Sequence, residues 1–181
     1  MNWITKFIKP KIASLFKKRT AETDQVLWTT CECKNLIYKE DLQKNLNCCP
    51  KCGAHHKLTC TERFEIFFDN KEFDLISTPL PKDDPINFVD KKKYTDRLRA
   101  ARKTTKQDDA VAISTGKVNN IQITVGAQDF RFIGGSFGAA SGEAFIHGVQ
   151  HAIDNKNPFI FFSCSGGQRM MESAIALMQM S

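Results

Sequence analysis

Apolar segments alternate with glycine-rich loops in the carboxyl-terminal third of the chain. Residues 158–162 form a short, aromatic-rich run without charge, which predicts a strand buried on both faces. Residues 121–125 predict a second strand, and residues 139–154 and 168–180 predict helices. The apolar face of the first helix would hold Phe145, Ile146, Val149 and Ile153. This order indicates an α/β domain with a parallel sheet, whose loops meet at the ends of the strands.

A pair of glycines follows each of these two strands. Gly134 and Gly135 follow the first strand, and Gly166 and Gly167 follow the second. A strand that turns through two glycines into a helix aims unpaired N–H groups, and the positive end of a helix dipole, at the space above the turn. Such a turn can hold an anionic oxygen. Each loop alone is equally consistent with a tight turn that lets a helix pack on a strand.

Three further elements are predicted upstream. Residues 60–69 form an amphipathic helix whose apolar side, with Phe64, Phe67 and Phe68, would pack in the core. Residues 91–106 form a basic helix with a solvated face. Residues 109–118 and 121–127 form a hairpin, because the two asparagines between them tolerate the positive φ of a tight turn.

The cysteines cluster near the amino terminus. Five of the seven lie between positions 31 and 52, and no secretory signal is apparent, so metal binding is favoured over disulfides. The sequence Cys-Pro-Lys-Cys-Gly at 49–53 is typical of half of a zinc ribbon, and 15 residues separate Cys33 from Cys49. The expected ligands are Cys31, Cys33, Cys49 and Cys52. Cys48 or His55 could replace Cys31, and metal-free thiols are the other interpretation. Cys60 and Cys164 are expected to pack as small apolar residues.

The positive charge of the chain is concentrated at its start. The formal net charge is +6, and residues 1–20 hold six basic residues and no acidic one. We expect residues 1–25 to be a basic leader that docks on a partner or stays loose, or else a weak membrane-surface arm. No apolar run approaches the ~20 residues that cross a bilayer, and a cytoplasmic location is expected.

Several segments in order resemble one known family. They are the Gly-Gly-Ser-Phe-Gly segment at 134–138, the segment Phe-Phe-Ser-Cys-Ser-Gly-Gly-Gln-Arg-Met-Met-Glu at 161–172, residues 177–180, residues 81–88 and 92–98, and the cysteine segment from Trp28. Together they resemble the amino-terminal half of carboxyltransferase β subunits of bacterial-type acetyl-coenzyme A carboxylases. The likeness covers about residues 26–181.

The resemblance implies a fold and a reaction. The fold would be a partial crotonase-like β-β-α spiral at 58–181, preceded by a four-cysteine zinc ribbon at 26–57. The reaction would transfer a carboxyl group from carboxybiotin, borne on a carrier protein, to acetyl-coenzyme A, and would give malonyl-coenzyme A for fatty-acid synthesis. The implied cofactors are structural zinc and biotin. The implied partners are a carboxyltransferase α subunit, the biotin carboxyl carrier protein and biotin carboxylase.

The resemblance also implies site residues. Backbone groups of Gly166 and Gly167 would form part of the oxyanion and coenzyme A pocket, with no catalytic side chain. Substrate-binding residues would be Gly134, Gly135, Ser136, Gly138 and Arg169. The chain departs from the family in having one residue between Cys31 and Cys33, where the family has two. The family also continues beyond Ser181 with a later glycine loop, so we expect little activity from this chain alone.

Two other functions fit parts of the sequence. Ser165 before Gly166 invites a serine hydrolase with His147 or His151 as base, but Ser163 stands where a nucleophile elbow needs glycine. A zinc ribbon with a basic arm is also typical of a weak nucleic-acid-binding protein.

Overall fold

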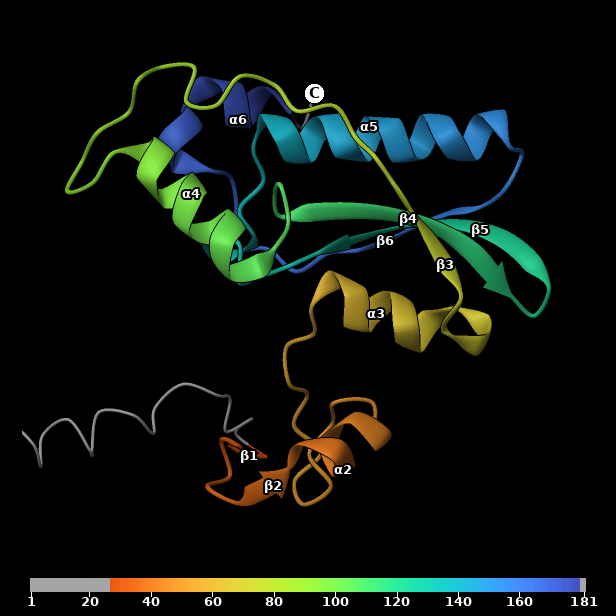
Figure 1. Ribbon diagram of the computed structural model, residues 1–181. Helices are drawn as coiled ribbons and strands as arrows, with labels where there is room; N and C mark the ends of the chain where they lie inside the picture. The colour runs from red at the N-terminus through yellow and green to blue at the C-terminus, as the bar shows by residue number, and fades with distance from the viewer. Residues whose placement is uncertain (1–26, 180–181) are drawn as a thin grey trace, which may run out of the picture. The chain divides into compact units, whose positions relative to one another are not determined.

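The computed structural model describes residues 27–179, which form two compact units divided between His56 and Lys57 (Figure 1). The predicted basic leader, residues 1–25, lies outside the described residues. Each unit is described by itself. No helix in the described part is long and apolar enough to span a membrane.

The first unit is a small hairpin followed by one short helix. Strands β1 (Trp28–Thr30) and β2 (Leu36–Tyr38) pair antiparallel, and α2 (Lys39–Lys44) follows directly. The buried residues at its centre are Cys31, Ile37, Leu42 and Cys49. Because two of these four are cysteines, the apolar core alone is too small to hold the unit together.

The second unit is built on one four-stranded sheet in the order β3-β4-β5-β6. Its strands are β3 (Phe73–Ile76), β4 (Val111–Val118), β5 (Ile121–Gln128) and β6 (Phe159–Phe162). The first three pair antiparallel, and β5 pairs parallel with β6. The parallel pairing predicted for the strands at 121–125 and 158–162 is confirmed by β5 and β6. The antiparallel pairing of β4 with β5 follows from the tight turn between them.

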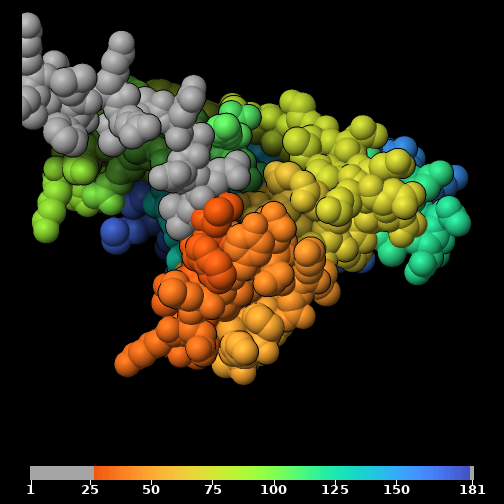
Figure 2. Space-filling view, turned by 60° about the horizontal axis from the view of Figure 1, so that its bottom comes forward, coloured from red at the N-terminus to blue at the C-terminus, as the bar shows by residue number. Residues whose placement is uncertain are grey.

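The hairpin between β4 and β5 confirms the turn predicted from two asparagines. Asn119 and Asn120 have φ values of 50° and 64°, and Val118 pairs with Ile121 across the turn. The N–H of Asn120 donates to the carboxylate of Asp69, 3.3 Å away, in the single turn η1 (Asp69–Lys71). Figure 2 shows this proximity from another side, with the green end of the hairpin against the yellow segment.

Two helices cover opposite faces of the sheet (Figure 1). Helix α3 (Cys60–Phe67) begins with a capping box, in which Thr59 and Glu62 satisfy each other's backbone N–H groups. As predicted, Phe64 and Phe68 are buried and Phe67 is partly buried. They pack against a set of β5 side chains, Ile123, Val125 and Ala127.

Helix α5 (Ala139–Asp154) has the predicted bounds, but only part of its predicted apolar face packs on the sheet: Phe145 contacts Phe159 and Phe161 of β6. Ile146 and Ile153 are each 62% exposed, so the predicted apolar face is wrong for them. The buried residues are small: Ser141, Gly142, Ala144, Gly148 and Ala152. A Cβ atom at Gly148 would lie only 2.9 Å from the Phe159 ring, so the helix approaches the sheet too closely for larger side chains.

Helix α4 (Tyr94–Thr105) confirms the predicted basic helix. Its three arginines form ion pairs on the exposed side, Arg97 with Asp90, Arg99 with Asp96 and Arg102 with Asp83. Its buried side packs in a second apolar cluster of Tyr94, Leu98, Ala110, Phe132 and Met171.

The segment after β6 differs from its prediction. The predicted helix over 168–180 begins late: a single turn η3 (Met170–Glu172) comes first, Ser173 has φ 51° and ψ −129°, and α6 (Ala174–Met178) follows. The positive end of a helix therefore does not lie at Gly166 and Gly167. Strand β6 is the last strand of the described sheet, and its four side chains are half-buried, so the predicted full burial on both faces is also wrong.

Candidate functional site

The two glycine loops lie against each other. Because β5 and β6 are parallel neighbours, the loops that follow them leave the same edge of the sheet. The N–H of Gly166 donates to the carbonyl oxygen of Gly134, at 2.9 Å. The N–H of Phe137 donates to Gly167 O at 2.9 Å, and the N–H of Arg169 donates to Phe137 O at 2.8 Å. We call residues 132–138 and 163–169 the loop pair.

The side chain of Gln128, buried at the end of β5, also connects the two loops. Its amide nitrogen donates to Gly135 O at 2.7 Å, and its amide oxygen accepts from the N–H of Cys164 at 3.2 Å. Gln128 could not be recognised from the sequence, because a single glutamine at the end of a strand carries no distinctive pattern.

Neighbouring atoms approach three of the predicted glycines closely. Gly135 has φ +64°, and a Cβ atom there would lie 2.1 Å from Cys164 O. A Cβ atom at Gly138 would lie 2.7 Å from the carboxylate of Glu172, and one at Gly166 would lie 3.3 Å from the neighbouring loop. These glycines let the two loops and the start of α5 approach one another.

Two glycines face open space instead. Gly134 has φ +68° and Gly167 has φ +121°, and a Cβ atom at either would meet nothing within 4 Å. Glycine is favoured at both positions by the backbone conformation alone. The backbone at these two positions is therefore where a ligand could approach the loop pair.

The backbone N–H groups of the second glycine pair are not unpaired, which corrects the prediction. The N–H of Gly166 bonds to the first loop, and the N–H of Gly167 donates to Ser165 Oγ at 3.0 Å. Ser165 Oγ in turn donates to Gly167 O at 3.1 Å. An oxyanion at Gly167 would have to replace the Ser165 hydroxyl as the acceptor.

Arg169, predicted to be a substrate-binding residue, is buried in the described structure. The side chain is 1% exposed and makes two hydrogen bonds to the carboxylate of Asp109, at 2.6 and 2.7 Å. It also donates to the carbonyl oxygen of Ser136 at 2.7 Å and lies 3.3 Å from its hydroxyl. Burial by itself lowers the pKa of Arg169, but the hydrogen bonds and charge of Asp109 outweigh it and raise the pKa.

Glu172 connects this arginine to two helices. One carboxylate oxygen accepts from the Tyr94 hydroxyl at 2.5 Å and lies 3.4 Å from the Arg169 guanidinium. The other accepts from the N–H of Ala139 at 2.6 Å, in the first turn of α5, where negative charge is stabilised. Burial and the bond to Glu172 raise the pKa of Tyr94, against the opposing charge of Arg169.

We call these five side chains the buried network: Tyr94, Asp109, Ser141, Arg169 and Glu172. The hydroxyl of Ser141 donates to Asp109 at 2.6 Å. The network could not be recognised from the sequence, because Asp109 and Tyr94 lie 60 and 75 positions from Arg169. Only the i, i+3 spacing of Arg169 and Glu172 could have suggested an ion pair.

A groove of about 570 Å³ lies beside the loop pair. Its apolar lining includes Phe137, Phe145, Ile146 and Phe161, and its polar lining includes Ser165 and Gly167. The Phe145 ring packs edge-on against Phe161, with ring centroids 5.2 Å apart. An apolar groove with convergent backbone groups is typical of a small-molecule site.

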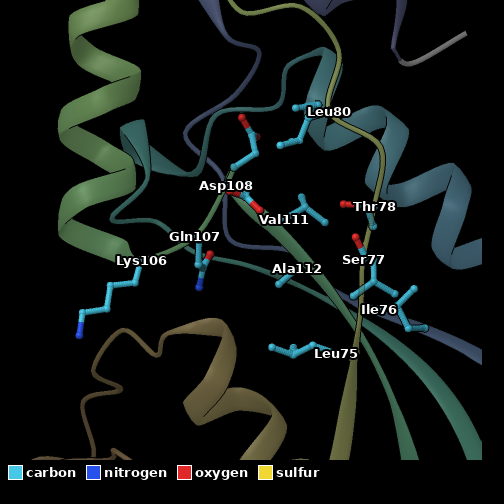
Figure 3. A pocket seen from close by; sticks show the side chains of 13 residues that line it. Leu75, Ile76, Ser77, Thr78, Leu80, Lys106, Gln107, Asp108, Val111 and Ala112 are labelled. Carbon is cyan, nitrogen blue, oxygen red and sulfur yellow. The ribbon is translucent and has the colours of Figure 1, made fainter.

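A second cavity of about 340 Å³ opens where the chain after β3 leaves the sheet. Figure 3 shows the segment from Leu75 to Leu80 on one side and Val111 and Ala112 of β4 on the other. Asp109 also lines this cavity, so the buried network borders it on one side.

The described geometry does not pair Ser165 with a histidine. Both hydrogen bonds of its hydroxyl are to Gly167, and His151 Nδ1 lies 3.0 Å from Thr124 Oγ1. His151 therefore packs on β5, as expected for a structural histidine. Within residues 27–179, no nucleophile–base arrangement forms around Ser165.

The four predicted cysteine ligands come together in the first unit. The sulfur atoms of Cys31, Cys33, Cys49 and Cys52 all lie within 4.8 Å of one another. Two of the separations are 3.6 and 3.9 Å. A tetrahedral zinc site with Zn–S bonds of ~2.3 Å needs sulfur separations of about 3.8 Å, so the cluster fits zinc.

The short spacing between Cys31 and Cys33 is accommodated by a tight turn. Lys34 has φ 65° and its N–H donates to Cys31 O at 2.8 Å. Asn35 Nδ2 then donates to Cys33 Sγ at 3.2 Å, which lowers the pKa of Cys33 to about 6 and favours the thiolate that binds metal. The alternative ligands Cys48 and His55 lie outside the cluster, with Cys48 Sγ 3.2 Å from His55 Nδ1.

Comparison with known proteins agrees with both halves of this description. Residues 28–52 match the model of the acetyl-CoA carboxylase zinc finger domain, and residues 57–181 match that of the carboxyl transferase domain. The chain is 46% identical to the acetyl-coenzyme A carboxylase carboxyl transferase subunit beta of Pelagibacter ubique, over 100% of this chain and 60% of that protein. Its identity to the protein of the same name from Jannaschia is 42%, over 99% and 56%.

The chain thus spans about 60% of the length of the curated relatives it matches. Among solved structures, a transcarboxylase 12S shares the fold of the described chain, with a TM-score of 0.50 and 24% identity over 68% of this chain and 22% of that one. The crotonase-like α/β fold preceded by a four-cysteine ribbon is thereby confirmed. Given the match over residues 57–181, the chain belongs to the carboxyl transferase domain family, and it carries an acetyl-CoA carboxylase zinc finger domain ahead of that domain.

Proposed function

We propose that this chain is the amino-terminal part of a carboxyltransferase β subunit. The subunit would transfer a carboxyl group from carboxybiotin to acetyl-coenzyme A and form malonyl-coenzyme A. The observation that carries the proposal is the loop pair, which places two glycine-rich backbones together beside an apolar groove. Family membership and the names of the relatives support the same reaction.

The proposed chemistry needs stabilised anions more than reactive side chains. Cleavage of the C–N bond of carboxybiotin would release carbon dioxide and leave negative charge on the ureido group, and removal of a methyl proton would place charge on the thioester oxygen. The ureido nitrogen would take that proton, and the enolate carbon would form the new C–C bond to the released carbon dioxide. Backbone donors fixed in advance are an effective way to stabilise such charges.

Individual glycines would have different roles in this reaction. Gly134 and Gly167 face open space and would contact substrate, and an oxyanion would take the place of Ser165 Oγ on the Gly167 N–H. The N–H of Gly166 would hold the two loops together through Gly134 O. Three buried residues would determine the shape of the loop pair from its inner side: Gly135, Ser136 and Gly138.

Zinc would have a structural role in the first unit. The four clustered cysteines would bind it as thiolates and would link the hairpin to the turn that contains Gly53. Bound zinc would supply stability to this small unit and take no part in the transfer.

The proposed activity needs other chains. We expect an α subunit to complete the site at an interface, and a biotin carboxyl carrier protein and biotin carboxylase to supply carboxybiotin in the cytoplasm. Sedimentation with a co-expressed α subunit should show a hetero-oligomer, and a chain that stays monomeric would count against this proposal. Weak nucleic-acid binding remains a prediction, because the basic leader on which it depends lies outside the described residues.

The reverse reaction, with malonyl-coenzyme A, biocytin and an α subunit, tests the function. We expect little turnover from residues 1–181 alone, since the loss of even one oxyanion donor costs ~10²- to 10³-fold. A chimaera that continues this chain with the remaining carboxyl-terminal part of the Pelagibacter ubique relative should restore turnover. A folded, zinc-loaded chimaera without turnover would overturn the function. Full turnover by residues 1–181 would show that these residues are sufficient for carboxyl transfer.

A further inference from the structure

We propose that Asp109 and Glu172 are positioning residues. They would fix the geometry of the loop pair by holding the side chain of Arg169, in the second loop, against the first loop. The proposal rests on the proposed function and names residues that the glycine motifs do not include. Neither carboxylate is expected to touch substrate, because each residue is only 4% exposed.

Arg169 belongs to the second loop and reaches the first loop at three points. Its main-chain N–H donates to Phe137 O at 2.8 Å, and its guanidinium donates to Ser136 O at 2.7 Å. Its Nε lies 3.3 Å from the Ser136 hydroxyl. The side chain therefore connects the two loops in addition to their backbone bonds.

Asp109 fixes the plane of that guanidinium. Its two oxygens accept from the two terminal nitrogens at 2.6 and 2.7 Å, a paired geometry that allows one orientation. Asp109 is itself held by the hydroxyl of Ser141, in the first turns of α5. The position of Arg169 is thus set by elements outside the loop pair.

Glu172 holds the place where the first loop becomes a helix. It accepts from the N–H of Ala139, directly after Gly138, and from the hydroxyl of Tyr94 in α4. A Cβ atom at Gly138 would lie 2.7 Å from this carboxylate, so carboxylate and loop are in close contact. Moving Glu172 would therefore move the end of the first loop.

The charges indicate that the buried network contributes more to the geometry of the loop pair than to the stability of the fold. The buried network holds one cation and two carboxylates, and the first N–H groups of α5 offset part of the excess negative charge. Buried ion pairs often add little stability compared with apolar residues, but they demand a fixed arrangement. Arg97 and Asp90 offer a contrast, because their ion pair lies at the surface and makes no hydrogen bond to the loop pair.

The first test measures native-state amide exchange in Asp109→Asn and Glu172→Gln, with Asp90→Asn as the matched control. We expect the amides of Phe137, Gly166 and Arg169 to lose at least about tenfold more protection than the amides of the β4–β5 hairpin in the first two variants. The control should change neither set. An equal loss of protection in both sets would mean a general loss of stability and would overturn the proposal.

The second test measures carboxyl transfer by the same variants in the chimaera. We expect kcat to fall about 10- to 100-fold with KM changed much less, because misplaced donors weaken the transition state more than substrate binding. Normal kcat in a variant with loosened loops would overturn the positioning role. An unsubstituted chimaera without turnover would instead overturn the proposed function and would leave the exchange result to decide the positioning of the loops.

A milder variant keeps the test decisive if a charge change prevents folding. Ser141→Ala removes one hydrogen bond from Asp109 and leaves all charges in place. We expect the same pattern with a smaller change, about threefold in loop exchange. Unchanged loop exchange in a folded Ser141→Ala variant would count against the coupling between α5 and the loop pair.

Discussion

The thiol cluster of the first unit and the buried network of the second are both polar centres inside a folded unit. They differ in how far apart their residues lie along the chain. The four cysteines lie within 22 positions, 31 through 52, whereas the network draws on residues from 94 to 172. The cluster can therefore form from one local segment. The network exists only after α4, β4, α5 and the segment after β6 have packed.

The two centres also differ in what they contribute. Structural zinc in small peptides supplies ~10–16 kcal/mol of folding free energy. A buried ion pair adds little net stability, although removing one partner costs about 3–5 kcal/mol. The comparison indicates that the first centre builds its unit, whereas the second aligns backbone that the rest of the core already holds.

Loss of zinc should have the largest effect. We expect one zinc per chain, and Cys52→Ser should release it and unfold the first unit, with a loss on the order of 10 kcal/mol. Elemental analysis and circular dichroism would measure both effects. Cys48→Ser is the control, because its sulfur contacts His55 outside the cluster. A zinc-free chain after reducing purification, or release of zinc by the control, would contradict the ligand set.

A side chain at Gly135 should be the next largest change. The Cβ atom of Gly135→Val would lie 2.1 Å from Cys164 O, so the loops must separate, and we expect a loss of about 3 kcal/mol in urea unfolding. Gly134→Ala is the control, since it has nearly the same φ but open space, and it should lose only about 1 kcal/mol. Equal losses would mean that backbone strain alone requires these glycines.

Cys60 tests the effect of burying a thiol without metal. Burial, together with the charge of Asp129, raises its pKa from 9.0 to about 12. The folded chain therefore favours the neutral thiol. The contribution of this thiol to the free energy of unfolding is complete below pH 9. It falls as the pH rises towards 12, by up to about 1.4 kcal/mol per pH unit. Urea unfolding should show this extra decline relative to Cys60→Ala. Parallel pH profiles of the two proteins would disprove it.

Ser165→Ala should have the smallest effect. The hydroxyl bonds only within its own loop, and its loss leaves the Gly167 N–H free to meet a ligand. We expect the reverse-reaction rate of the chimaera to stay within about tenfold. A loss of ~10⁴-fold or more is typical of a catalytic nucleophile and would revive the serine hydrolase hypothesis.

Features that depend on neighbouring residues could be predicted from the sequence. The two asparagines at 119 and 120 specified the hairpin, and the bounds of α5 were predicted as they occur. The grouping of the four cysteines followed from their spacing, and the glycine pairs correctly marked two loops that come together. Each of these features is determined by conformational preferences or chemistry within a short segment.

Features that depend on distant partners required the tertiary structure. Helical spacing located the apolar residues of α5, but close contact with β6 selected its small residues for burial. Arg169 stands in the loop that carries the glycines, and only the approach of Asp109, 60 positions away, makes it a buried connector. Local sequence determines backbone preference and candidate chemistry, whereas burial and pairing depend on atoms that meet only when the chain has folded.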